Sequence, residues 1–132
     1  MSYEILFTEE HREQVVRYHG EKVANQLEER LEKKQEELEL ISEPNQLGRR
    51  FHNFFGYDGV KIAEPSFKAH RNQYRGILIL VENADALVFY KVIQKEERDE
   101  SSEQFRTVQS IEKNPRKVTK FAKDVVLEEM DL

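Results

Sequence analysis

The stretch QYRGILILVENADALVFYKVIQKEERD, from Gln73 to Asp99, contains two long apolar runs separated by the turn-type residues ENADA. Each run is rich in Ile, Leu, Val and aromatic residues, which favour β-strands. We therefore predict a hairpin with strands at about residues 74–81 and 87–93. Because the apolar residues are nearly continuous, both faces of these strands should be buried, as in the centre of a sheet. Helices are expected to cover one side of that sheet.

Positively charged residues surround the open end of this predicted hairpin. A turn centred near Ala84 pairs residues whose numbers sum to about 168, which places Arg75 opposite Ile93. The charged residues and the histidine expected at this end are Lys68, His70, Arg71, Arg75, Lys95 and Arg98. Like charges repel, so such a cluster costs stability unless an anion or a partner occupies it. Alternatively, the acids that follow Lys95 neutralise it and Arg98 in ordinary surface pairs.

Helical patterns lie on both sides of the hairpin in the sequence. After a short strand candidate in SYEILF, Thr8 is a good N-cap for a first helix, and Gly20 is a stop signal. A second helix is expected from about Glu21 to Ile41, because Leu and Val recur there at helical spacing. Near the C-terminus we expect a helix at about residues 103–113, a break at Pro115 and a further helix.

Composition and charge fit a soluble globular domain with a highly charged surface. The chain has 132 residues, 36% charged residues and no cysteine, which excludes disulfides and thiolate chemistry. Its start lacks the features of an export signal and no apolar run could span a membrane, so we expect a cytoplasmic protein. Acids predominate from Glu9 to Glu43, whereas cations predominate from Gly48 to Arg75. That asymmetry indicates either a polyanion site or simply a solvated charged surface.

The predicted fold class is α+β, with an N-terminal helical hairpin packed on a small antiparallel sheet and a C-terminal helical extension. We expect one domain, in which residues 1–106 form the main unit and residues 107–132 extend it.

Several segments, taken in order, resemble the RelE/ParE superfamily of toxins from toxin–antitoxin systems. They are the first strand and glycine-linked helices, the loop QLGRR, the segment FKAHRNQYRGILIL, and the end VFYKVIQKEERDESSEQF. The resemblance covers about Ser2 to Arg106, and it lies in the ordered set rather than in any single motif. Within the superfamily, the chain is most similar to the RelE-type ribonucleases.

The resemblance implies roles for individual residues. The basic pair of the family falls on Lys68 and His70, of which either would be the general base. An alternative register instead uses Lys61 as a substrate-binding residue. Arg75, with Arg71 or Arg98, would clamp the phosphate, and Lys95 or Arg98 would lie near the leaving group. The sequence departs from the family where Glu96 replaces an arginine and where Phe105 occupies the place of a substrate-contacting tyrosine.

The implied function is that of a type II toxin, an endoribonuclease that cleaves mRNA on the ribosome and thereby inhibits translation. Attack of the ribose 2′-OH on the adjacent phosphate needs a base, an acid and cations, but no metal or other cofactor. The implied partners are mRNA, the ribosome and a cognate antitoxin, with no membrane. The alternatives are a ParE-like toxin that poisons gyrase, or a catalytically inactive member that acts as a binding module.

Overall fold

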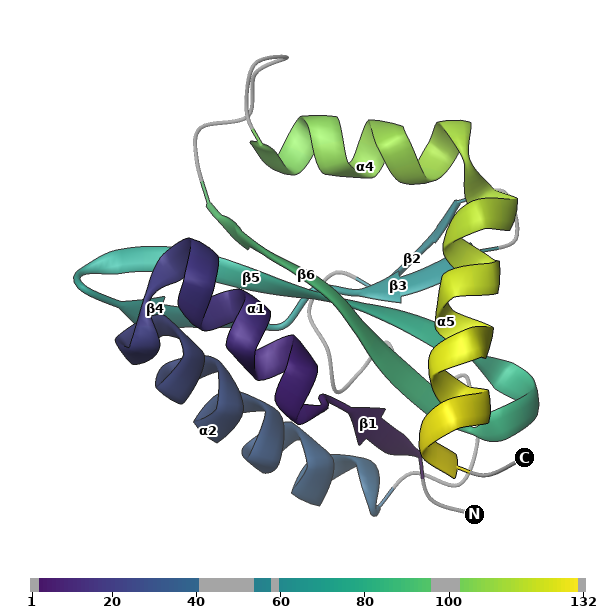
Figure 1. The fold of residues 1–132 in the computed structure, drawn as a ribbon, viewed down its shortest axis with the longest axis horizontal. Helices are drawn as coiled ribbons and strands as arrows, with labels where there is room; N and C mark the ends of the chain where they lie inside the picture. The colour runs from purple at the N-terminus through teal and green to yellow at the C-terminus, as the bar shows by residue number, and fades with distance from the viewer. Residues whose placement is uncertain (1–2, 41–53, 58–59, 96–102, 131–132) are drawn as a thin grey trace.

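The computed structural model of the chain describes residues 3–40, 54–57, 60–95 and 103–130, which form a mixed α+β fold. A short strand and two helices come first, five strands follow, and two helices end the described chain (Figure 1). The elements are β1 (Glu4–Leu6), α1 (Glu9–His19), α2 (Glu21–Leu38), β2 (Phe54–Tyr57), β3 (Val60–Ala63), β4 (Ser66–Ala69), β5 (Asn72–Val81), the 3-10 helix η2 (Glu82–Ala84), β6 (Ala86–Gln94), α4 (Glu103–Lys113) and α5 (Pro115–Met130).

Strands β5 and β6 are the hairpin predicted from the sequence, joined through η2 and Asp85, whose φ is +50°. Arg75 lies opposite Ile93, as expected from the turn position. Closer to the turn, a bulge between Ile77 and Leu78 shifts the register by one residue. The bulge adds a residue to one strand only. Paired residue numbers therefore sum to 168 at the open end of the hairpin, as predicted, but not between the bulge and the turn.

The sheet is mixed rather than antiparallel, because β1 pairs parallel with β6 whereas the other pairs are antiparallel. In the described part of the chain the strand order is β1-β6-β5-β3-β2, and β4 also pairs with β5. Strands β3 and β4 use successive parts of the same edge of β5, on either side of Glu64 and Pro65. Proline cannot donate to a ladder, so the break falls there, and the carbonyl of Pro65 instead accepts from the N–H of Gly76 at 3.0 Å.

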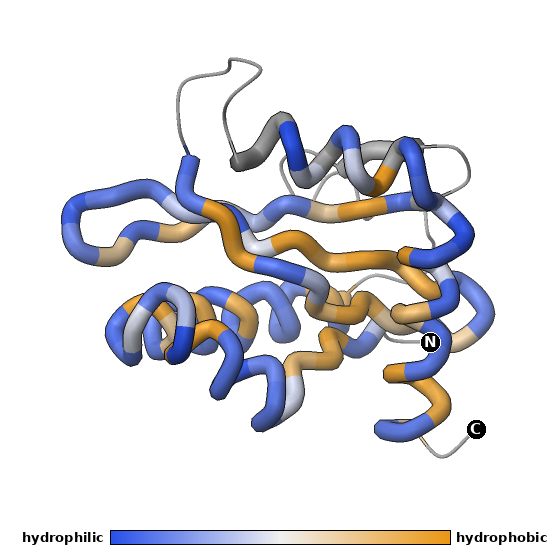
Figure 2. Tube along the Cα trace, turned by 45° about the horizontal axis from the view of Figure 1, so that its top comes forward, coloured by the Kyte–Doolittle hydropathy of each residue, from blue (hydrophilic) through white to orange (hydrophobic). Residues whose placement is uncertain are grey.

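Helices cover both faces of the sheet, which corrects the expectation that they cover one side. One apolar cluster joins α1 and α2 to β5 and β6 through residues such as Leu27, Leu78 and Phe89. A second cluster, on the opposite face, joins α4 and α5 to the same strands through residues such as Ile79 and Ile111. Figure 2 shows hydrophobic residues concentrated along the central strands, and the helices alternate between hydrophobic and hydrophilic. The continuous apolar pattern of β5 and β6 therefore reflects two cores.

Helix α2 approaches the sheet closely at Gly76. A Cβ atom built at this position would lie 3.2 Å from Leu27 Cδ1 and 3.9 Å from Pro65 Cγ. Because Leu27 is fully buried, it has little room to yield. The glycine in the segment YRGILIL therefore allows the helix to pack against the strand.

Helix α1 starts as predicted at Thr8, whose hydroxyl accepts from the N–H of His11 at 3.1 Å. The His11 ring completes a capping box, because its Nδ1 accepts from the N–H of Thr8 at 3.1 Å. The ring also packs against Phe7 and Phe89. This burial lowers the pKa of His11, and the nearby carboxylates of Glu10 and Glu129 oppose part of that effect. His11 is thus a capping residue whose ring belongs to the core.

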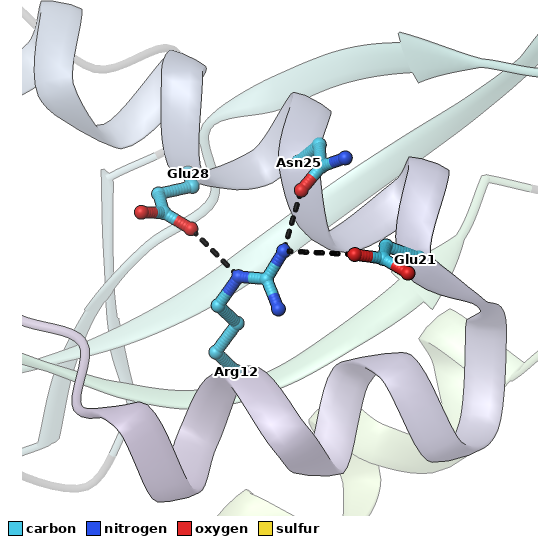
Figure 3. Close-up of polar contacts among 4 residues, drawn as sticks. All are labelled: Arg12, Glu21, Asn25 and Glu28. Atoms are coloured by element: carbon cyan, nitrogen blue, oxygen red, sulfur yellow. Dashed lines mark hydrogen bonds and ion pairs between the residues drawn. The ribbon is translucent and has the colours of Figure 1, made fainter.

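Arg12 links α1 to α2 across the turn at Gly20, where φ is +95°. Figure 3 shows its guanidinium between three side chains of α2. The Nε donates to Glu28 at 2.9 Å, and Nη2 lies 2.5 Å from Asn25 Oδ1 and 3.9 Å from Glu21. Helix α2 ends at Leu38 within the described residues, and its predicted end at Ile41 lies outside them.

The outer edge of β1 is closed by a side chain instead of a strand. The amide of Gln35, on α2, accepts from the N–H of Ile5 at 2.7 Å and donates to the carbonyl of Tyr3 at 2.8 Å. These are the two bonds that a neighbouring strand would make at this place. The side chain therefore satisfies the backbone of an edge strand that would otherwise be open.

Candidate nucleic-acid interface

The β4–β5 hairpin carries His70 and Arg71 at its tip. Ala69 pairs with Asn72, so these two exposed residues alone form the loop. Their φ values are +52° and +67°, the left-handed conformation that both positions of a type I′ turn require. Asn-Gly is the usual choice in such turns, so an imidazole and a guanidinium at this tip are held at a cost in backbone strain. Strain of this kind is often found at functional sites.

A row of polar residues crosses three strands beside this tip. Lys68 of β4 pairs with Gln73 of β5, and the N–H of Lys95, at the end of β6, donates to the carbonyl of Gln73 at 2.8 Å. Neighbouring strands are spaced about 4.8 Å apart, so the backbones of the two lysines lie about 10 Å apart with Gln73 between them. Both lysines are exposed. We call Lys68, His70, Arg71 and Lys95 the cation cluster.

Strand alternation places this row on the face of the sheet that α4 and α5 cover. Phe67 and Tyr74, which flank the row in sequence, belong to the core on the α1 and α2 side. Successive side chains point to opposite faces, so Lys68 and Gln73 face the other way. Ile93 belongs to the α4 and α5 core, and Lys95 lies two residues further along the same face. The row is therefore a continuation of that face beyond its apolar part.

Arg75 does not join the cation cluster at the surface. Its side chain is buried, with a residue exposure of only 7%, and its Nη1 lies 3.1 Å from Oε2 of Glu64, which is 1% exposed. Within the described part of the chain, Arg75 Nε has no hydrogen-bond partner. The expectation that Arg75 faces solvent was wrong. Its guanidinium is buried because the carboxylate of Glu64, immediately before Pro65, is buried beside it and forms an ion pair with it. A phosphate clamp at this position would require the pair to open.

Lys61 lies at the opposite end of β5 and forms a salt bridge with Glu82. Ile62 pairs with Ile79, whereas Lys68 pairs with Gln73. The two lysines are therefore about seven residues apart along β5, or about 23 Å. This separation argues against the register in which Lys61 takes part in the site.

The remaining predicted residues fall partly outside what the structure describes. Arg98 and the loop QLGRR lie outside the described residues. Phe105 lies in α4, but its side chain is outside the described part. The cluster that the structure brings together is thus Lys68, His70, Arg71 and Lys95.

Two residues that matter to this region were not singled out from the sequence. Gln73 occupies the centre of the row, and the hairpin register, with residue numbers summing to 168, already places it opposite Lys95. Glu64 is one of few acids in the basic segment that ends at Arg75. An isolated acid beside a proline, near a strand that is apolar on both faces, is the signal that would have indicated a buried pair.

The arrangement offers positive charge, an imidazole and an amide on one exposed edge. Lysine and arginine bind phosphate oxygens, and a histidine can accept or donate a proton. Among the described residues, no group of His, Asp or Glu side chains is placed to hold a metal ion. None of the described helices combines the length and hydrophobicity needed to cross a bilayer.

Comparisons with protein-family models, curated proteins and solved structures find no match to this chain. The resemblance to the RelE/ParE superfamily therefore rests on the sequence segments given above.

Proposed function

We propose that this chain binds single-stranded RNA through the cation cluster and cleaves it without a metal, as a RelE-like toxin of a type II toxin–antitoxin system. The observation that carries the proposal is the row of Lys68, Gln73 and Lys95 beside a strained turn that presents His70 and Arg71. Within the described residues, no ion pair joins these cations to an acid, and such a group at one sheet end is most simply explained by a polyanionic ligand.

In this proposal each residue of the cation cluster has a role in RNA binding or cleavage. Lys68 and Lys95 hold phosphates on either side of Gln73, and the Arg71 fork, rather than Arg75, contacts the scissile phosphate. His70 takes the proton of the 2′-OH, whose oxygen attacks the phosphorus as the bond to the 5′ oxygen breaks. The departing 5′ oxygen receives a proton from Lys95 or another acid. The products are a 2′,3′-cyclic phosphate and a free 5′-OH.

A second function, RNA binding without cleavage, is favoured by the burial of Arg75. The arginine expected to clamp the phosphate is paired with Glu64 in the interior, which removes the strongest bidentate group from the site. The lysines and the hairpin tip would still bind the RNA backbone. A ParE-like action on gyrase has no comparable support from the described residues.

The first experiment measures binding and compares the removal of lysines at the two ends of β5. Fluorescence anisotropy with a labelled single-stranded RNA should show that Lys68→Gln/Lys95→Gln binds at least tenfold more weakly than wild type. The slope of log affinity against log salt should fall by about 1.4, because each lost phosphate contact contributes about 0.7. Lys61→Gln, which removes one exposed lysine at the far end of β5, is the control and should change binding little. A loss of binding free energy for Lys61→Gln that reaches half the loss for the double variant would refute the interface.

The second experiment separates cleavage from binding. Purified protein is added to mRNA on programmed ribosomes in the presence of a chelator, and the fragments are mapped. His70→Asn should keep the turn, since asparagine tolerates the left-handed conformation, yet reduce cleavage by about a hundred- to ten-thousandfold. Wild-type protein that binds RNA but leaves the mRNA intact would establish the second function instead. Wild-type cleavage by His70→Asn would exclude this histidine as the base.

A further inference from the structure

Among the described residues, part of the outer edge of β6 has no strand partner. β1 pairs only with Ala86, Leu87 and Val88, and no other described strand pairs with that edge. The N–H of Lys95 points to Gln73 of β5. Because alternate residues of a strand direct their N–H and C=O to opposite edges, those of Val92 and Gln94 point away from β5.

A groove of about 640 Å³ follows this edge. Four consecutive residues of β6, from Phe89 to Val92, line it together with residues of α1 and with Phe121 of α5. Phe89 and Val92 belong to the core on one face of the sheet and Tyr90 packs against the core on the other, so a groove that touches all of them runs along the strand edge, not along one face. Its two walls are therefore α1 on one side and α5 on the other.

The walls of the groove are largely apolar and aromatic. Tyr18 of α1 is 70% exposed and Phe121 is 37% exposed, although both are large and hydrophobic. Phe121 lies edge-on to Tyr90, with ring centroids 5.6 Å apart. Val15 lines the α1 side. An exposed aromatic patch beside an unpaired strand edge is typical of a peptide-binding surface.

On the same side of the sheet, the neighbouring edge strand β1 is protected by a side chain. At β1 the amide of Gln35 supplies both missing backbone bonds. No proline interrupts β6, and Lys91 is the only charged residue from Ala86 to Gln94. Proteins commonly protect free edges with prolines, charges, β-bulges or a covering segment. Lys91 and the bulge at Tyr90 are two such features, so Val92 to Gln94, beyond them, are the residues of this edge best suited to receive a strand.

We propose that this groove binds an extended segment of a partner protein, which pairs with β6 beyond Val88 and adds a strand in line with β1. The central part of the bound segment is about four apolar residues, because side chains on either face of the added strand contact the α1 wall or the Phe121 wall of the groove. Acidic residues follow at the end near His19 and Lys95, because α1 begins at the other end with Glu9 and Glu10, and the Glu10 and Glu129 carboxylates act electrostatically on His11 there. This surface is distinct from the cation cluster and does not depend on RNA binding.

The test uses a fluorescein-labelled peptide with one lysine, a Val-Ile-Val-Ile core and two glutamates, measured by anisotropy against the whole chain. Gln94→Pro removes an N–H that points away from β5 and leaves the β5 ladder in place, whereas Gln94→Ala keeps that N–H. We expect wild type and Gln94→Ala to bind alike and Gln94→Pro to bind at least tenfold more weakly. Tyr18→Ser should also weaken binding, because it removes part of the α1 wall.

Two N-methylated peptides make the test independent of whether Gln94→Pro folds. One is methylated at the first and third core amides and the other at the second and fourth, so only one set of methyl groups meets β6. One peptide should therefore bind nearly as well as the unmodified peptide and the other should not bind. Absence of binding by wild type, or equal binding of both methylated peptides, would overturn the proposal. So would a dimer in sedimentation equilibrium that the peptide displaces, because a second copy would then be the occupant.

Discussion

Replacing Arg75 by methionine should destabilise the fold by about 3–5 kcal/mol, because it removes the cation that lies 3.1 Å from the buried Glu64 carboxylate. The two charged groups are 3.1 Å apart, and their residues are 7% and 1% exposed. With an effective dielectric constant of about 20, charges at that distance attract by about 5 kcal/mol. Since a domain of this size is stable by about 5–15 kcal/mol, the single variant should be close to unfolding at the lower limit.

The double variant Arg75→Met/Glu64→Leu separates the charge effect from packing. Replacing a buried ion pair by apolar residues of similar volume is often neutral or stabilising, so this protein should regain most of the lost stability. Lys68→Met, an exposed lysine on the neighbouring strand, is the control and should change stability by less than about 0.5 kcal/mol. Urea unfolding followed by far-ultraviolet circular dichroism suits a chain without tryptophan.

Three results would refute this reasoning about Arg75. The first is an Arg75→Met variant as stable as Lys68→Met, which would mean that the guanidinium is solvated. The second is a double variant no more stable than Arg75→Met, which would mean that the charges are not coupled. The third is a folded double variant that no longer binds RNA, since the cation cluster should bind without Arg75.

The pKa of His11 is lowered by burial, so the unfolded chain binds a proton more readily than the folded one. The contribution of neutral His11 to the free energy of unfolding should therefore be fully present above about pH 6.5 and be lost as the pH falls toward the lowered pKa. His11→Gln keeps a capping acceptor but does not titrate, so it should flatten this decline in urea unfolding measured between about pH 7 and 5. Gln35→Met should cost about 1–3 kcal/mol by leaving the β1 backbone groups unpaired, whereas Glu36→Met on the exposed side should cost little, as judged by urea midpoints. Gly76→Ala should cost about 1–3 kcal/mol because its methyl meets Leu27 Cδ1, and Leu27→Val should recover part of this loss in thermal melting of the double variant.

Local patterns in the sequence were sufficient to predict most of the elements. Apolar periodicity and capping residues predicted the hairpin of β5 and β6, the N-cap at Thr8 and the helix from Glu103 to Lys113. The pairing of Arg75 with Ile93 followed from the position of the turn alone. These features depend on residues close together in the chain, and that is why a single sequence reveals them.

Features set by distant contacts were missed. The parallel pairing of β1 with β6 joins residues about 80 positions apart, and nothing local indicates it. The same limit applies to the packing of α4 and α5 on the second face. In the candidate site, the positions of Lys68, His70 and Lys95 were predictable from register, but the burial of Arg75 was not. It depends on Glu64, whose placement is fixed by the break between β3 and β4.

The bonds between Gln35 and β1 have a consequence for the order in which the chain folds. β1 can complete its pairing with β6 only after a loop of about 80 residues has closed, which is slow because the entropy of closure precedes the gain. Gln35 lies only 30 residues from Ile5 along the chain, so β1 can dock on α2 first. We expect the segment of β1, α1 and α2 to assemble as an early folding unit. During synthesis, β1 would then already be docked on α2 before the strands that complete the sheet have been made.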